Sequence, residues 1–212
     1  MSPRKAAALR DGTDGLSLRE HLVATAARLI AERGTAGLTV RDIAREARVA
    51  DGVLYNHFEG KEELLALALH AHVRSVERDL GPLPAVPGEG TVAGNLSACL
   101  TYGLALHTAF LPAFAGLISQ PEVLARFHAL PNPLGEGRGL HTMLTDYLHA
   151  ERDLGRLSPG ADPEAAATLL VGACHELVLP RLLRGTPTPP EIPPTVAETL
   201  ITTLMNGLAP ST

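Results

Sequence analysis

The stretch from Leu38 to Leu65, LTVRDIAREARVADGVLYNHFEGKEELL, predicts two short helices joined by a tight turn, followed by the start of a third helix. Thr39 and Asp42 have the spacing of a capping box, in which a hydroxyl and a carboxylate bind free N–H groups at a helix start. Apolar residues then recur at helical spacing as far as Ala47, so one face of the first helix is apolar.

The second helix is expected at residues 51–58, where Leu54 and Phe58 are four residues apart and face inward. Its other positions are polar, small or amphipathic and are expected to point outward. Two helices joined by a turn of three or four residues, the second with a polar face, are typical of a helix-turn-helix. Such a motif inserts its second helix into the major groove of DNA.

Many positions of this stretch also match a family pattern at fixed spacing: Leu38, Thr39, Val40, Asp42, Ile43, Ala44, Ala47, Val49, Gly52, Leu54, Tyr55, His57, Phe58, Lys61, Glu62, Glu63 and Leu64. The pattern resembles the DNA-binding domain of the TetR family of bacterial transcriptional regulators. It covers about the first quarter of the chain, and the rest is similar to the family only in length and expected helical content. The resemblance implies an all-α chain, with an N-terminal three-helix helix-turn-helix domain and a C-terminal helical domain for ligand binding and dimerisation.

The sequence departs from the family pattern at two positions in the turn. Arg48 stands where the family usually has Gly, and Ala50 stands where it usually has Ser or Thr. Because the Ala50 side chain has no acceptor, we expect Asp51 to cap the second helix. A capping Asp51 would be less free to contact a base.

Lys61 favours DNA binding independently of the family. It lies in the first turn of the following helix, where a cation opposes the helix dipole by roughly 0.3–1 kcal/mol. We interpret Lys61 as a phosphate anchor, and the alternative is a solvated lysine. The expected DNA-binding residues are Thr39, Arg41, Asp51, Gly52, Val53, Tyr55, Asn56, His57 and Lys61.

Two kinds of DNA contact are expected from this set. The side chains of Tyr55, His57 and Lys61 are expected to hold phosphates, which fix the position of a protein on the duplex. Asn56 suits a bidentate contact with adenine, and Val53 suits a thymine methyl group. The expected partner is a double-stranded operator with two-fold symmetry.

The net charge of −5 is distributed unevenly along the chain. Residues 1–50 carry nine Lys and Arg residues against six Asp and Glu residues, a net charge of +3, so the remainder carries −8. The positive field therefore lies in the part of the chain expected to face DNA. Because this excess is modest, we expect affinity to depend on a dimer with specific contacts.

The composition, with 45% hydrophobic and 19% charged residues, is typical of a soluble globular protein, and we expect the protein in the cytoplasm. No uninterrupted run of about 18 apolar residues occurs, so we expect no membrane-spanning segment and no membrane partner. Cys99 and Cys174 lie far apart and are expected to be buried free thiols, which fits a reducing compartment.

Three regions are expected along the chain: a flexible N-terminal arm at 1–16, the helix-turn-helix domain at 17–62 and the helical ligand-binding and dimerisation domain at 63–210. Capping boxes at Ser17 and Thr195 are expected to open the first and last helices, and Asp162, followed by a proline, is expected to cap the helix before the last. Beyond residue 60, helices are expected at about 61–80, 91–111, 121–129, 135–153, 163–184 and 195–207, because Gly and Pro interrupt the apolar periodicity between them.

Aromatic and histidine residues gather in the middle of the chain and suggest a pocket for a small apolar or aromatic effector. Core packing is the alternative interpretation for each of these residues taken singly. In the TetR family the middle helices of the second domain hold such a site. The expected ligand-binding residues are Tyr102, His107, Phe110, Phe114, Phe127, Met143, Tyr147 and His175.

The last two expected helices carry wide apolar stripes, suited to partners on both sides. In the TetR family such a pair meets its symmetry mate as a four-helix bundle, which implies a homodimer. The alternative is that both stripes belong to the core of one chain. The expected dimer-interface residues are Leu169, Leu170, Ala173, Leu177, Val196, Leu200 and Leu204.

Other functions have less support in the sequence. No nucleophile elbow, zinc-protease motif, Walker loop or dinucleotide-binding glycine fingerprint occurs, so we expect no enzyme activity, no cofactor and no metal site. A DNA-binding regulator without a small ligand, a helical ligand-binding module without DNA recognition and a helical enzyme remain as alternatives.

Overall fold

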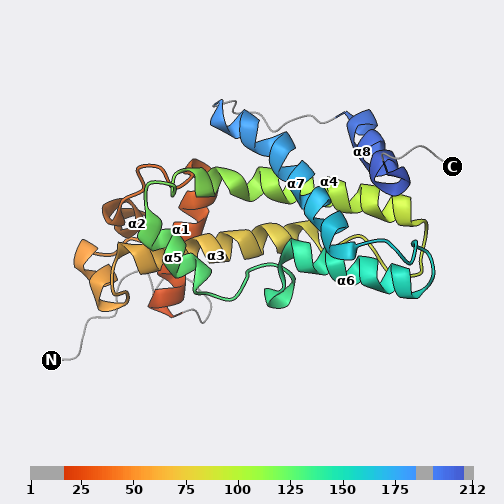
Figure 1. Cartoon of the computed structure of the whole chain (residues 1–212). Coiled ribbons are helices and arrows are strands. Elements are labelled where there is room, and N and C mark those ends of the chain that lie inside the picture. Colours follow the sequence, from red (N-terminus) through yellow and green to blue (C-terminus); the bar gives the residue numbers. More distant parts are fainter. Residues whose placement is uncertain (1–16, 185–192, 208–212) are drawn as a thin grey trace. The chain divides into compact units, whose positions relative to one another are not determined.

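The structure, a computed structural model, describes residues 17–184 and 193–207. These ranges are helical and contain no strand, as expected for an all-α chain (Figure 1). The expected arm at 1–16 and most of the proline-rich stretch 186–194 lie outside the described residues. The elements are α1 (Leu18–Arg33), α2 (Val40–Glu46), the 3₁₀ helix η2 (Asp51–Asn56), α3 (Lys61–Leu80), α4 (Val92–Ala115), α5 (Pro121–His128), the 3₁₀ helix η3 (Gly135–Gly137), α6 (Gly139–Asp153), α7 (Pro163–Leu183) and α8 (Pro194–Asn206).

The chain packs as two units, and the boundary between them differs from the domain boundary expected after residue 62. Unit 1 combines the chain up to Ser75 with the segment Pro112–Pro133, and unit 2 combines Val76–Leu111 with the chain from Leu134 onward. The larger part of α3, up to Ser75, belongs to unit 1, and its Leu64, Leu65 and Leu69 are almost fully buried in the core of that unit. Each unit is therefore discontinuous in sequence.

The helix starts and the core of unit 1 follow the caps and the apolar spacing seen in the sequence. Ser17 and Thr39 both form the expected capping boxes, at the starts of α1 and α2. The core between these helices holds Leu22, Leu29 and Ile43, all 0–1% exposed. This core supports the outward-facing residues of the helix-turn-helix.

The C-terminal end of α4 is held inside unit 1 by a buried threonine. The α4 helix continues through Pro112, beyond its expected end near residue 111, and stops at Ala115. The Thr35 hydroxyl, on a side chain only 1% exposed, donates to the Ala113 carbonyl at 2.6 Å and so satisfies one of the open carbonyls of the helix end. Gly116 makes this close approach possible, because a Cβ there would lie 2.6 Å from the Ala36 nitrogen.

Unit 2 has a core formed by α4, α6, α7 and α8. Leu100, Leu144 and Ile201 are 1–3% exposed in this core, and α6 packs along α7. As expected, Asp162 caps α7 through its side chain, and both cysteines are buried and free.

Two expectations for unit 2 are wrong. The α6 helix begins at Gly139 instead of Gly135, because a short 3₁₀ turn with positive φ at Glu136 precedes it. The capping box at Thr195 does not form: α8 already begins at Pro194, and its N-cap position is Pro193, which makes no side-chain cap. Proline at the first helical position replaces the hydroxyl cap there, because its fixed φ suits a helix start.

The helices α4 and α7 are each long and apolar enough to cross a membrane, judged by length and composition alone. We expected no membrane-spanning segment because no uninterrupted run of about 18 apolar residues occurs. That criterion passes over these two helices, whose mean hydropathy is high although polar residues interrupt their apolar runs. In its most apolar window α4 is 44% buried, as a core helix would be, whereas α7 is only 22% buried. A large part of the apolar surface of α7 is therefore uncovered within the chain.

We predict that Thr35→Val lowers the free energy of unfolding by about 1–3 kcal/mol, because the buried Ala113 carbonyl then has no donor. Urea unfolding followed by circular dichroism measures this change. The matched control is Thr101→Val, since the exposed Thr101 hydroxyl bonds only to Ser97 of its own helix and its loss should cost less than roughly 0.5 kcal/mol. Equal effects of the two substitutions would contradict the role of Thr35.

Candidate nucleic-acid interface

The first helix of the motif begins with a closed hydrogen-bond ring. The Thr39 hydroxyl accepts from the Asp42 N–H at 3.2 Å, and the Asp42 carboxylate accepts from the Thr39 N–H at 3.1 Å. Donation by the Thr39 hydroxyl and N–H lowers the pKa of Asp42 below its ordinary value. The Thr39 side chain is therefore engaged with its own helix, although the residue is exposed.

The turn after α2 is a Schellman motif. The Val49 N–H donates to the Ala44 carbonyl at 3.0 Å, and the Arg48 N–H donates to the Arg45 carbonyl at 3.2 Å. Arg48 has φ +56, in the left-handed region that glycine adopts without strain. The departure from glycine at this position therefore keeps the turn but adds backbone strain.

The recognition element is a 3₁₀ helix over Asp51–Asn56, shorter than the expected helix at 51–58. Ala50 occupies the N-cap position without a side-chain bond, as expected for alanine. The expectation that Asp51 caps the helix is wrong. The Asp51 carboxylate instead lies 3.5 Å from the Arg41 Nε, and both side chains are exposed.

The exposed and buried faces of the recognition element follow the apolar spacing. Leu54 and Phe58 are 2% and 5% exposed and anchor the segment in the core of unit 1. Gly52 and Asn56 are exposed, and the Tyr55 side chain is 64% exposed. A bulky aromatic side chain left this open at a helix-turn-helix is available to a partner.

Val53 and His57 occupy intermediate positions on the same element. Both are half-buried, so each presents only part of its side chain outward. Their predicted roles, apolar contact with a thymine methyl and contact with a phosphate, need only that exposed part.

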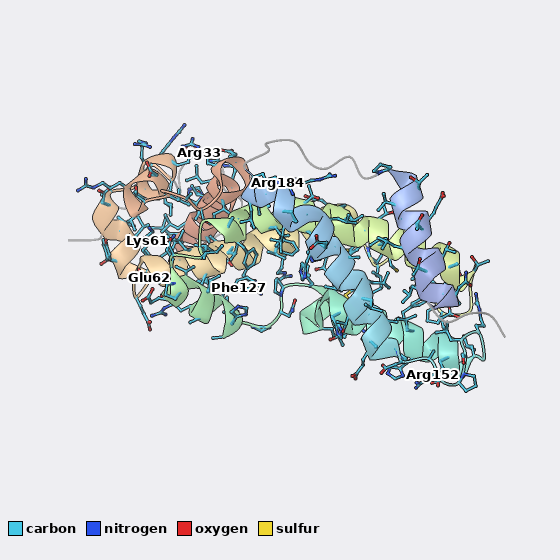
Figure 2. The ribbon with its side chains drawn as sticks, turned by 45° about the horizontal axis from the view of Figure 1, so that its top comes forward. Arg33, Lys61, Glu62, Phe127, Arg152 and Arg184 are labelled. Atoms are coloured by element: carbon cyan, nitrogen blue, oxygen red, sulfur yellow. The ribbon has the colours of Figure 1, made fainter. Side chains whose placement is uncertain are left out.

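Lys61 lies at the start of α3, next to Glu62 and close to the recognition element (Figure 2). Glu63 accepts bonds from Arg19 and from the Glu59 N–H. None of the ion pairs formed by the described residues includes Lys61. Lys61 and Tyr55 border the same small surface depression, so the two predicted phosphate contacts share one surface.

The eight predicted ligand residues are divided between the two units. Phe114 and Phe127 belong to unit 1, where their ring centroids are 5.2 Å apart against its core. The other six belong to unit 2: Tyr102, His107, Phe110, Met143, Tyr147 and His175. Spacing along the chain cannot reveal this split, because it arises where α4 passes from one unit to the other.

His107 is the buried polar centre of the group in unit 2. Its Nδ1–H donates to the Gly103 carbonyl at 2.6 Å, and its ring centroid lies 4.7 Å from that of the exposed His175. Burial lowers the pKa of His107 below its ordinary value, and the neighbouring His175 acts in the same direction.

The predicted dimer residues vary in exposure. Leu170 is buried, whereas Leu169 is 63% exposed and Leu200 is 36% exposed. Ala173, Leu177, Val196 and Leu204 are half-buried. The sequence analysis missed Leu183, which is 74% exposed at the end of α7, although the apolar stripe of that helix extends to it.

Comparison with known proteins agrees with this arrangement. Residues 22–68 match the family model described as bacterial regulatory proteins, tetR family. The HTH-type transcriptional repressor KstR2 from Rhodococcus jostii (strain RHA1) is 48% identical over 56 residues, which are 26% of this chain and 28% of KstR2. This chain thus spans about a quarter of the length of the curated relatives that it matches.

Solved structures extend the likeness to the whole fold. The fatty acid degradation regulator FadR from Bacillus halodurans has a TM-score of 0.62 at 17% identity and covers 90% of this chain and 95% of its own. FadR from Bacillus subtilis, solved in complex with stearoyl-CoA, has a TM-score of 0.57 at 19% identity. The match covers 90% of this chain and 99% of that FadR chain. Residues 22–68 therefore match the DNA-binding domain of the TetR family, and the chain shares the fold of these solved regulators. It has their N-terminal helix-turn-helix domain and C-terminal helical domain.

We predict that Arg48→Gly raises the free energy of unfolding by roughly 0.5–1 kcal/mol. Glycine relieves the strain at φ +56, and the greater entropy of the unfolded chain offsets part of the gain. The control is Arg45→Gly inside α2, where glycine should lower the free energy of unfolding by about 1 kcal/mol. Both are measured by urea unfolding, and a loss of stability in Arg48→Gly would contradict the strain.

We also predict that His107 makes stability pH-dependent. Its pKa is lower in the folded chain than its ordinary value of 6.5, so the unfolded chain binds more protons. The free energy of unfolding should therefore fall as the pH drops below about 6.5, and His107→Gln should remove this part of the fall. Urea titrations between about pH 7.5 and about pH 5.5, roughly one unit on either side of that value, measure both slopes. Identical slopes would contradict the assignment.

Proposed function

We propose that the protein is a homodimeric transcriptional repressor that binds a pseudo-palindromic DNA operator and leaves it when a small molecule binds. The observation that carries the DNA-binding part is the anchoring of the recognition element by Leu54 and Phe58, which leaves Gly52, Tyr55 and Asn56 open. The KstR2 relative is itself named a repressor, which favours repression here. We place the protein in the cytoplasm, where its operator would be.

The dimeric part of the proposal is supported by α7 and α8. Leu169 and Leu183 are 63% and 74% exposed on α7, and Leu200 is 36% exposed on α8. Large apolar side chains exposed on two helices in this way favour a surface that a partner covers. A two-fold dimer presents two recognition elements to half-sites one helical turn apart, about 34–36 Å.

The DNA contacts fall into positioning and reading groups. We assign phosphate contact to Tyr55, His57 and Lys61, and base reading to Asn56 and Val53. Arg41 adds a contact when its guanidinium leaves the exposed pair with Asp51, a change that costs little because solvent screens such pairs. Thr39 contributes through its position at the helix start, because its hydroxyl is engaged with Asp42.

Release by an effector requires two conformations with different affinities for it. The FadR protein from Bacillus subtilis was solved with stearoyl-CoA, and a related fold supports a ligand in the helical domain here. To empty the operator, the effector must bind the DNA-incompetent state roughly 10²–10⁴ times more tightly than the competent one.

The experiment that tests the function is selection of bound sequences from a random duplex pool by the purified protein at several salt concentrations. We expect enrichment of a two-fold symmetric motif with half-sites one turn apart. Weak, salt-sensitive binding without enrichment would contradict sequence-specific regulation by this chain.

We predict that Lys61→Ala weakens binding to all duplexes similarly, because phosphate contacts carry no sequence information. Losing one contact in each half of a dimer should reduce the slope of log affinity against log salt concentration by about 1.8. Fluorescence anisotropy across a salt series measures this slope. Lys61→Arg should keep it, Glu62→Ala serves as a control in the same helical turn, and an unchanged slope in Lys61→Ala would contradict the assignment.

A further inference from the structure

Unit 2 contains a cavity of ≈ 340 Å³ at the end of α6 and the start of α7. The first turns of α4, the middle of α6, the loop 154–162, the first turns of α7 and the end of α8 line it. Figure 2 marks the end of α6 by Arg152, which donates to the Ala161 carbonyl at 3.3 Å and holds the loop that forms one wall. This volume lies in the range of sites for small molecules.

The walls of the cavity are mostly aliphatic, with Arg156, Ser158 and Asp162 as their polar members. Leu96, Leu148, Ala166, Leu169 and Leu204 lie around it, and its lining contains no aromatic side chain. None of the eight ligand residues expected from the sequence borders it. The cavity is therefore a different place from the predicted aromatic site.

The charged groups at the cavity are already engaged by the protein. The Arg156 guanidinium donates to the Gly90 carbonyl at 2.6 Å and pairs with Glu151 at 3.2 Å. The Asp162 carboxylate accepts from the N–H groups of Glu164 and Ala165 at the start of α7. Both charged side chains thus already have partners of complementary polarity within the chain.

Arg156 is held especially firmly because its partner is fully buried. Glu151 is 0% exposed, and its other oxygen accepts from the Gly88 N–H at 3.2 Å. Releasing Arg156 would leave this buried carboxylate without a counter-charge, which is strongly unfavourable. The charge of Arg156 is therefore already balanced by a buried carboxylate, which favours an uncharged ligand over an anionic one.

Ser158, an exposed residue at the cavity, can offer an uncharged hydrogen-bond donor. Its hydroxyl oxygen accepts from the Gly160 N–H at 3.3 Å, and the hydroxyl proton can turn towards a ligand. A carbonyl or ether oxygen is the complementary group.

We propose that this cavity binds an uncharged, mainly aliphatic small molecule that carries a hydrogen-bond acceptor. Its consequence for DNA rests on the proposed function. Because α7 and α8 both line the cavity and both carry the proposed dimer residues, a bound molecule sets the spacing of these two helices. The cavity thereby links ligand binding to the dimer interface.

The test uses the full-length protein with 2-decanone as the ligand, measured by displacement of the uncharged fluorescent probe N-phenyl-1-naphthylamine. We expect 2-decanone to bind at least about tenfold more tightly than decanoate, which is of similar length but charged. Equal affinities would overturn the assignment to an uncharged ligand.

Two variants locate the binding. Ala166→Phe fills the cavity and should weaken 2-decanone binding at least about tenfold, whereas Ala105→Phe, on an exposed face of α4, should not. Should Ala166→Phe unfold, Ser158→Ala in the loop tests the same site, with an expected loss of about threefold to tenfold. Unchanged binding in a folded Ala166→Phe or in Ser158→Ala would overturn the proposal.

Two further outcomes distinguish ligand binding from filling of the cavity by a second copy, and failure of this proposal from failure of the proposed function. Loss of binding as the protein concentration is raised and the chain dimerises would mean that a second copy fills the cavity, which overturns the proposal. Binding of 2-decanone to the free protein is measured without DNA, so it stands even if operator affinity does not change. In that case only the effector part of the proposed function fails.

Discussion

The burial of Leu54 and Phe58 is the constraint on which the DNA-facing surface of this chain depends. The recognition element is six residues long, and an isolated helix of that length is not stable in water. It keeps its shape because these two side chains, 2% and 5% exposed, are part of the core of unit 1. The same two anchors decide which positions point outward.

Buried polar groups add definition where helices meet or end. The Thr35 hydroxyl donates to a carbonyl at the end of α4, and the His107 ring donates to a carbonyl within α4. In unit 2, Glu151 forms an ion pair with Arg156. Each of these groups lies inside a packed unit, where an unpaired donor or acceptor costs more than the bond contributes when formed. They therefore specify one arrangement of the helices as well as stabilising it.

The apolar surface of unit 2 suggests a connection between effector and dimer. The cavity touches α7 and α8, and the same helices expose Leu183 and Leu200. A ligand that changes the spacing of α7 and α8 would alter how a second copy packs on them. Such a route needs no contact between the ligand and the aromatic group around His107.

Much of the fold and the outward face of the recognition element could be predicted from the sequence. Residues that act on near neighbours in the chain gave reliable expectations: the capping boxes at Ser17 and Thr39, the cap at Asp162 and the inward pair Leu54 and Phe58. Their effect is local, because a cap or an apolar spacing of four works within one or two helical turns. The expected start of α8 at a Thr195 capping box was wrong, because a proline occupies the first helical position and no side-chain cap forms.

The sequence alone therefore determined the helical class, the helix-turn-helix and the family pattern within residues 22–68. Only the tertiary structure decided that Asp51 pairs with Arg41, that Phe127 packs in a different unit from His107, and that an aliphatic cavity lies beside Ser158. The physical reason is distance along the chain. Contacts between residues tens of positions apart depend on how whole helices pack, and periodicity within one helix carries no information about its neighbours.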